Sequence, residues 1–145
     1  MEMKKDLLIC IAFHYNSDRL KYLQQVLSNF IDNYKCSFDI IIDTNIADLP
    51  SAYSLYNNKL ITVHTHTNLQ HPFYLVWQHR KHVKENIDNY DVVAYFEDDI
   101  LLPYENYLNY LENFKILWPL FVPAFIRIEE NNGEQFVTDI VEPVY

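Results

Sequence analysis

Residues 91–103 read DVVAYFEDDILLP, an apolar run that leads directly into three consecutive carboxylates. Residues 92–96 have the composition of a strand that is buried on both faces. The acids Glu97, Asp98 and Asp99 therefore lie at the carboxyl end of a predicted strand. In an extended segment, side chains two residues apart point the same way, so we expect Glu97 and Asp99 to converge on one cation while Asp98 faces elsewhere. Hard oxygen ligands of this kind suit Mg²⁺ or Mn²⁺.

The alternative for the acidic triplet is a solvated turn in which Asp99 caps a helix that follows Pro103. Position favours the metal site, because ligands of open α/β sheets bind outside the carboxyl ends of the strands. Three adjacent carboxylates also repel one another unless a positive charge lies close to them.

Apolar segments of strand and helix character alternate along most of the chain. The patterns predict buried strands at residues 7–13, 38–42, 59–64 and 92–96, and amphipathic helices at residues 20–34, 72–87 and 104–117. Ser17 or Asp18 is expected to cap the first helix, and Pro72 to begin the second.

A hairpin is predicted near the C-terminus. Asn132-Gly133 is a strong hairpin signal, and extended patterns at residues 121–128 and 136–141 flank it. The sequence thus predicts a single α/β domain over residues 1–145, with a mostly parallel sheet flanked by helices and an antiparallel C-terminal hairpin.

Charge and glycine content limit the ligands that this chain can bind. The net charge is −9, from 20 acidic and 11 basic side chains, which argues against nucleic acid or anionic lipid as the main partner. With Gly133 as the one glycine, neither a P-loop nor a dinucleotide fingerprint can be written. A phosphate-bearing ligand would therefore have to be neutralised by a metal or by a few placed basic groups.

The apolar run at residues 7–13 is too short to span a bilayer, and no membrane span is predicted. Two cysteines, Cys10 and Cys36, are too few and too different in setting for a disulfide framework. These features predict a cytoplasmic protein, and a peripheral position on the cytosolic face of a membrane is equally compatible with them.

Basic and imidazole side chains gather in and before the second predicted helix. Arg80 falls within its apolar stripe, and two explanations stay open: a snorkelling stem whose head reaches solvent or pairs with a carboxylate, or a guanidinium directed at a diphosphate or at the acidic cluster. Five histidines lie between residues 64 and 82. Their spacing provides no recognised zinc site, so loop or surface histidines are predicted, with His64 and His66 near the ligand.

From Asn68 to Pro103, an asparagine, an arginine-bearing helix and a hydrophobic strand ending in acid-acid-Asp resemble the nucleotide-sugar-binding half of GT-A fold glycosyltransferases, closest to the family-2-like group. The resemblance implies that the EDD triplet is a DXD-type motif. Asp99 would then coordinate Mn²⁺ or Mg²⁺ bridging the donor diphosphate, with Glu97 as a further ligand.

The same resemblance assigns donor contacts to other positions. Glu97 or Asp98 would contact the ribose or the sugar, and Arg80 the diphosphate side. The base and ribose would be held at the end of the first strand and after the second, by Phe13, His14, Tyr15, Asn16 and Asp43.

The chain departs from the family in two respects. The glycine and small residues that the family has around the arginine helix are replaced by HPF at residues 71–73 and HRK at residues 79–81. The acceptor half, which usually provides the catalytic base, is expected to be short or missing. Spacing selects none of the available carboxylates near the C-terminus, which are Glu129, Glu130, Asp139 and Glu142.

The resemblance implies a metal-dependent glycosyltransferase that moves a sugar from a UDP- or GDP-linked donor to a hydroxyl of a glycan or other acceptor. The alternative is a non-catalytic nucleotide-sugar-binding module, or a truncated transferase completed by another chain. A phosphoacceptor signalling domain is disfavoured, because it requires an acid pair after the first strand and residues 13–16 read FHYN.

Overall fold

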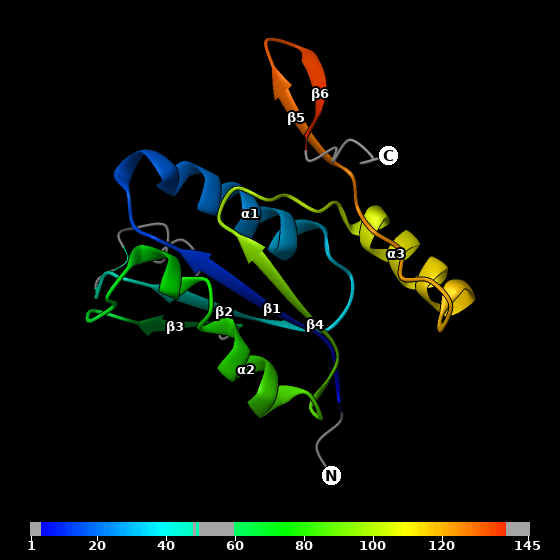
Figure 1. The fold of residues 1–145 in the computed structure, drawn as a ribbon, viewed down its shortest axis with the longest axis horizontal. Helices are drawn as coiled ribbons and strands as arrows, with labels where there is room; N and C mark the ends of the chain where they lie inside the picture. Colours follow the sequence, from blue (N-terminus) through cyan, green and yellow to red (C-terminus); the bar gives the residue numbers. More distant parts are fainter. Residues whose placement is uncertain (1–3, 48, 50–59, 139–145) are drawn as a thin grey trace, which may run out of the picture. The chain divides into compact units, whose positions relative to one another are not determined.

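The computed structural model describes residues 4–47, 49 and 60–138. The chain divides into two compact units, residues 1–104 and residues 105–145. The first unit is built on a four-stranded parallel sheet with the order β3-β2-β1-β4 (Figure 1). Its strands are β1 Lys5–Phe13, β2 Phe38–Thr44, β3 Ile61–Thr65 and β4 Tyr90–Glu97. The predicted α/β class and parallel sheet are confirmed.

The central strand β1 is the core of the sheet. Its residues from Leu7 onward are all buried, as expected for a parallel strand that is covered on both faces. Ile9 lies between Ile40 of β2 and Ala94 of β4 in the strand register. The continuous apolar run in the sequence therefore corresponds to a strand with neighbours on both sides.

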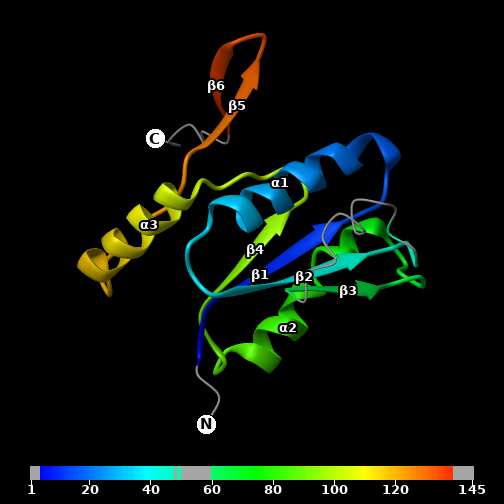
Figure 2. The same cartoon turned by 180° about the vertical axis from the view of Figure 1, so that it is seen from behind.

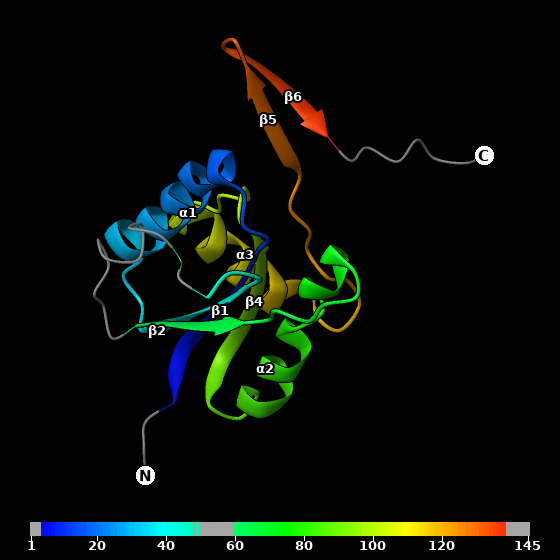
Figure 3. The same cartoon turned by 90° about the vertical axis from the view of Figure 1, so that its left-hand side faces the viewer.

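Helices cover both faces of the sheet, as the views from behind and from the side show (Figures 2 and 3). One face carries the short 3₁₀ helix η1 (Ser17–Arg19) and α1 (Leu20–Asn33), and the other carries η3 (Pro72–Leu75) and α2 (His79–Asn86). Two adjacent residues of β4 demonstrate the division. Phe96 packs against Phe30 of α1 with ring centroids 5.3 Å apart, whereas Tyr95 packs against His79 of α2 at 4.3 Å.

The first helical segment follows its sequence pattern closely. The buried side chains of α1 recur at helical spacing, at Leu23, Val26, Leu27 and Phe30. α1 begins at Leu20 as predicted, but the capping residue is Asn16 and not Ser17 or Asp18: its side chain accepts a hydrogen bond from the backbone N–H of Asp18 at the start of η1.

The prediction of one continuous helix over residues 72–87 is wrong. The segment consists of η3 and α2, separated by a turn, and a 3₁₀ segment has 3.0 residues per turn instead of 3.6. The sequence pattern places Phe73, Trp77 and Ile87 on the apolar stripe of this helix, but these side chains are 74%, 54% and 60% exposed. Leu75 and His82 are buried instead.

The second unit contains most of α3 (Tyr104–Leu117) and a two-stranded antiparallel sheet. Strands β5 (Arg127–Asn131) and β6 (Glu134–Thr138) flank Asn132 and Gly133, whose φ values are 53° and 81°. Positive φ at both turn residues is the type I′ geometry that Asn-Gly favours. The hairpin is confirmed as a separate sheet. Its first strand begins at residue 127 instead of 121, and predicted residues 139–141 lie outside the described part.

Among the residues with described positions, no helix has both the length and the apolar character needed to cross a bilayer.

Candidate functional site

The site lies where the strand order of the parallel sheet reverses. The chain passes from β1 to β2 through α1 on one face, and from β3 to β4 through α2 on the other, so β4 pairs with β1 on the side opposite to β2 and the order changes direction between β1 and β4 (Figure 1). Ala12 near the end of β1 is paired in register with Glu97 at the end of β4. Ligands of open α/β sheets bind at such a switch point.

A pocket of about 280 Å³ is present at this position. One part of its lining is polar, and another is apolar and comes from the segment around η3. The lining residues are Ala12, His14, Asn16, Arg19, Pro72, Phe73, Leu75, Val76, Glu97 and Asp98.

The acidic triplet forms a turn that Arg19 holds from the side of η1. Arg19 donates from Nε to Asp98 Oδ2 at 2.9 Å and from Nη2 to Asp98 Oδ1 at 2.8 Å, and its Nη2 also lies 3.1 Å from Asp99 Oδ2. The hydrogen bonds to Asp98 raise the pKa of the Arg19 guanidinium above its usual range. The positive charge that the cluster requires is therefore supplied within the chain, and repulsion among the acids does not by itself demand a metal.

The expected alternation of the three acids stops at the end of the strand. β4 ends at Glu97, and the backbone N–H of Ile100 bonds back to the carbonyl of Glu97 at 3.2 Å, which closes a turn. Glu97 and Asp98 both line the pocket, so Asp98 does not face elsewhere as expected. Asp98 is 4% exposed, whereas Glu97 and Asp99 are exposed.

The segment after this turn is fixed to α1. The carbonyl of Leu102 accepts hydrogen bonds from Asn29 Nδ2 at 2.8 Å and from the hydroxyl of Tyr34 at 3.0 Å. Together with Arg19, these contacts attach both ends of the acidic turn to the same helical segment.

The four residues predicted at the end of β1 divide into two pairs. His14 and Asn16 line the pocket. Phe13 is fully buried and packs edge-on to Tyr15, whose backbone N–H bonds to Asn45 Oδ1 at 2.7 Å. Only the first pair is placed to touch a ligand in the pocket.

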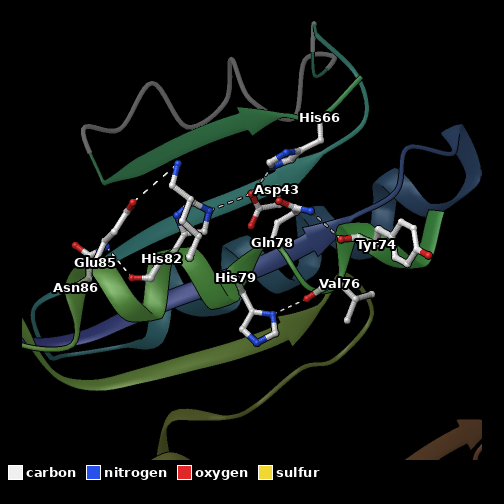
Figure 4. Close-up of polar contacts among 10 residues, drawn as sticks. Asp43, His66, Tyr74, Val76, Gln78, His79, His82, Glu85 and Asn86 are labelled. Atoms are coloured by element: carbon white, nitrogen blue, oxygen red, sulfur yellow. Dashed lines mark hydrogen bonds and ion pairs between the residues drawn. The ribbon is translucent and has the colours of Figure 1, made fainter. Parts of the chain in front are cut away.

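Asp43 lies at the end of β2 and is 1% exposed. Two histidines form hydrogen bonds with its Oδ1, His66 through Nε2 at 2.7 Å and His82 through Nε2 at 3.1 Å (Figure 4). His64 stacks on His82 with ring centroids 4.8 Å apart, and desolvation, followed by the neighbouring His82, lowers the pKa of His64. Asp43 is therefore engaged by the protein itself and is not in the pocket lining.

Arg80 does not line the pocket, and a different arginine contacts the acidic triplet. Arg80 is exposed, and its guanidinium lies 5.3 Å from the ring centroid of Trp77, outside the pocket lining. Arg19 occupies the place beside the acids. Sequence reasoning missed it, although its position just after the first strand, at the same edge of the sheet as the acids, was a usable signal.

The remaining candidates are the metal ligands and the carboxylates near the C-terminus. Within residues 4–47, 49 and 60–138, no group of three or more His, Cys, Asp or Glu is arranged to hold a metal ion. Glu129 lies in β5, where its Oε1 is 3.0 Å from Arg127 Nη2, and Glu130 is the next residue of that strand. Asp139 and Glu142 lie outside the described residues.

Neither a scan against protein-family models nor a search of the curated proteins finds a match to this chain.

Proposed function

We propose that this chain is a nucleotide-sugar-binding domain of the GT-A type that acts in metal-dependent glycosyl transfer. The observation that carries the proposal is the pocket at the switch point of the parallel sheet, with Glu97 and Asp98 in its lining. Its volume of about 280 Å³ is close to the lower end of the range for small-ligand sites, about 300–1,000 Å³. It can enclose part of a nucleotide sugar, and the remainder would extend beyond it.

The donor atoms at the pocket suit a divalent ion that is shared with a phosphate ligand. Mg²⁺ is commonly bound through one or two carboxylates plus substrate phosphates, so a cage of three protein ligands is not required. Glu97 lines the pocket with an exposed carboxylate, and the Asp99 side chain is 30% exposed. These two carboxylates would hold Mn²⁺ or Mg²⁺. When bound, the ion would neutralise the charge that develops on a departing diphosphate.

The chain's own residues contribute orientation and charge. Arg19 holds the acidic turn in place through the bidentate contact with Asp98, and its guanidinium lies in the pocket lining. Because Arg19 is already paired with Asp98 and Asp99, a bound cation would supply the positive charge that an anionic ligand needs at this acidic site. His14 and Asn16 provide polar contacts, while Phe73 and Val76 provide an apolar surface on the η3 side.

Calorimetry with UDP and GDP, each with and without Mn²⁺, tests the proposal. We expect one nucleotide to bind in a Mn²⁺-dependent manner and Asp99→Ala to abolish the metal-dependent part. Asp91→Ala is the matched control, because Asp91 is at the start of the same strand, where its side chain is 63% exposed and pairs with Lys4. A folded wild type that binds neither nucleotide would overturn the proposal.

Transfer and hydrolysis assays with UDP- and GDP-linked sugars separate the enzyme from the alternative. Metal-dependent release of the nucleoside diphosphate that is lost in Asp99→Ala supports glycosyl transfer. Full activity in Asp99→Ala would contradict the assigned role of this carboxylate. Nucleotide binding without turnover would favour a non-catalytic module or a transferase that another chain completes.

A further inference from the structure

The apolar wall of the pocket belongs to a segment whose two ends meet at one buried atom. Pro72, Phe73, Leu75 and Val76 form that wall. His66 precedes the wall in sequence and His82 follows it, and both of their Nε2 atoms contact Oδ1 of Asp43 (Figure 4). The carboxylate of Asp43 thereby closes residues 66–82 into a loop.

The direction of both hydrogen bonds depends on the histidine tautomers. An ionised carboxylate only accepts hydrogen bonds, so with Asp43 ionised each histidine Nε2 carries a hydrogen and donates it to Asp43. The bonds are charge-assisted, and Asp43 and His82 are only 1% and 5% exposed, where such bonds are stronger than in water. Loss of the carboxylate would leave two donors without their shared acceptor.

The two ends of the loop are held to different extents. The backbone N–H of His66 also bonds to the carbonyl of Thr44 at 2.7 Å, and the His66 side chain is 24% exposed. His82 lies within α2, and its side chain is 7% exposed. At the His66 end, the bond to Asp43 is thus one of two that hold the loop. At the His82 end, the bond to Asp43 joins β2 directly to α2.

We propose that Asp43 is a positioning residue, whose shared oxygen fixes the apolar wall of the pocket through His66 and His82 without touching the ligand. This role differs from the direct base or ribose contact that the family resemblance implies for Asp43. The effect of Asp43 on ligand affinity rests on the proposed function. Its effect on the position of the apolar wall does not.

Hydrogen exchange of the ligand-free protein, followed by mass spectrometry, tests the inference on the wall itself. In Asp43→Ala we expect amides of residues 73–78 to exchange about tenfold faster than in wild type, because local opening becomes easier. Asp43→Asn keeps an acceptor oxygen at the same place and should restore most of the protection. Asp39→Ala is the matched control: Asp39 is on the same strand, but its partners are Lys5 and Tyr90.

Wild-type exchange at residues 73–78 in a folded Asp43→Ala variant would overturn the inference. If Asp43→Ala does not fold, His66→Ala decides, because this partly exposed side chain can be removed at lower cost. If amides of residues 73–78 exchange several-fold faster in His66→Ala, while exchange at the far ends of β1 and β4 does not change, the loop closure is supported. Unchanged exchange in His66→Ala would contradict it.

Nucleotide titration of the same variants distinguishes this inference from the proposed function. Weaker binding in Asp43→Ala, with rescue in Asp43→Asn and a parallel change in exchange, supports both. Faster exchange in Asp43→Ala, when wild type binds no nucleotide, retains the positioning role and removes the proposed function. Equal loss of affinity in Asp43→Ala and Asp43→Asn with an unchanged wall would identify a direct ligand contact and overturn the positioning role.

Discussion

The two faces of the parallel sheet are built from different chemistry. On the α1 face, a helix with a continuous apolar stripe packs Phe30 against Phe96. On the α2 face, the contacts include a buried carboxylate with two histidines, and a histidine ring tilted against that of Tyr95. The first arrangement excludes water over a large area, and the second depends on a few directional bonds. We therefore expect the α1 face to dominate stability and the α2 face to adjust the geometry of the pocket.

Truncating the aromatic core of the α1 face should have the largest effect. Phe30→Ala removes a fully buried ring and should lower the free energy of unfolding by about 3–5 kcal/mol. Phe73→Ala is the matched control on the other face, where the ring is 74% exposed, and it should change stability by less than about 0.5 kcal/mol. Urea unfolding followed by circular dichroism measures both. Similar losses of unfolding free energy in the two variants would contradict the expected difference between the faces.

Removing the arginine that links the α1 side to the acidic turn should have the next largest effect. Arg19→Ala leaves the Asp98 carboxylate buried without its bidentate partner, and we expect a loss of about 2 kcal/mol. Arg80→Ala removes an exposed guanidinium that lies over Trp77 and should cost less than about 1 kcal/mol. The same unfolding experiment applies. A cost for Arg80→Ala equal to that of Arg19→Ala would show that the acidic turn gains nothing special from Arg19.

Two tyrosines of β4 should respond in opposite directions. Among the described residues, the Tyr95 hydroxyl is buried without a hydrogen-bond partner, so Tyr95→Phe should stabilise the fold by about 1 kcal/mol. The Tyr90 hydroxyl donates to Asp39 Oδ2 at 2.6 Å, so Tyr90→Phe should destabilise it by about 1 kcal/mol. Thermal unfolding of both variants gives the signs. Loss of stability in Tyr95→Phe would mean that this hydroxyl has a partner, such as bound water, in solution.

The smallest effect should be a dependence of stability on pH at His64. Its pKa is lower in the folded chain than the unfolded value of about 6.5, so the unfolded chain binds more protons below that pH. Stability should therefore fall as the pH decreases from about 6.5 towards the folded pKa and then level off. His64→Gln should flatten this decrease. Unfolding curves between pH 7.5 and about pH 5 test this, and identical slopes in the two proteins would exclude His64 as the source.

Sequence patterns predicted the elements where one physical requirement dominates. The apolar runs of β1 and β2, the stripe of α1 and the Asn132-Gly133 turn each have a local cause in burial, amphipathicity or backbone φ. The residues from 72 to 87 were predicted poorly, because they form a 3₁₀ helix and a separate α-helix, and Trp77 between them is exposed. Such a break depends on how the segment packs and is not visible in residue spacing.

The candidate site could be predicted only in part. The position of the acidic triplet at a strand end located the pocket, because parallel strands present their carboxyl ends at one edge. The partner of Asp98 was missed: Arg19 follows the first strand and so lies at the same edge as the acids, but its pairing with an acid 79 residues away is fixed only in the folded chain. Likewise, Asp43 was recognised as a candidate, but its engagement by His66 and His82 depends on three elements that meet only in the folded chain.

The sequence by itself determined the α/β class, the parallel sheet and the C-terminal hairpin, because local apolar periodicity and turn chemistry are properties of neighbouring residues. Tertiary structure decided which charges are available to a ligand. It pairs Asp98 with Arg19 and buries Asp43 in hydrogen bonds with two histidines. Glu97 remains exposed in the pocket lining. The physical reason is that the ligand-binding capacity of an ionised side chain depends on its burial and its partners, and both are set by residues distant in the chain.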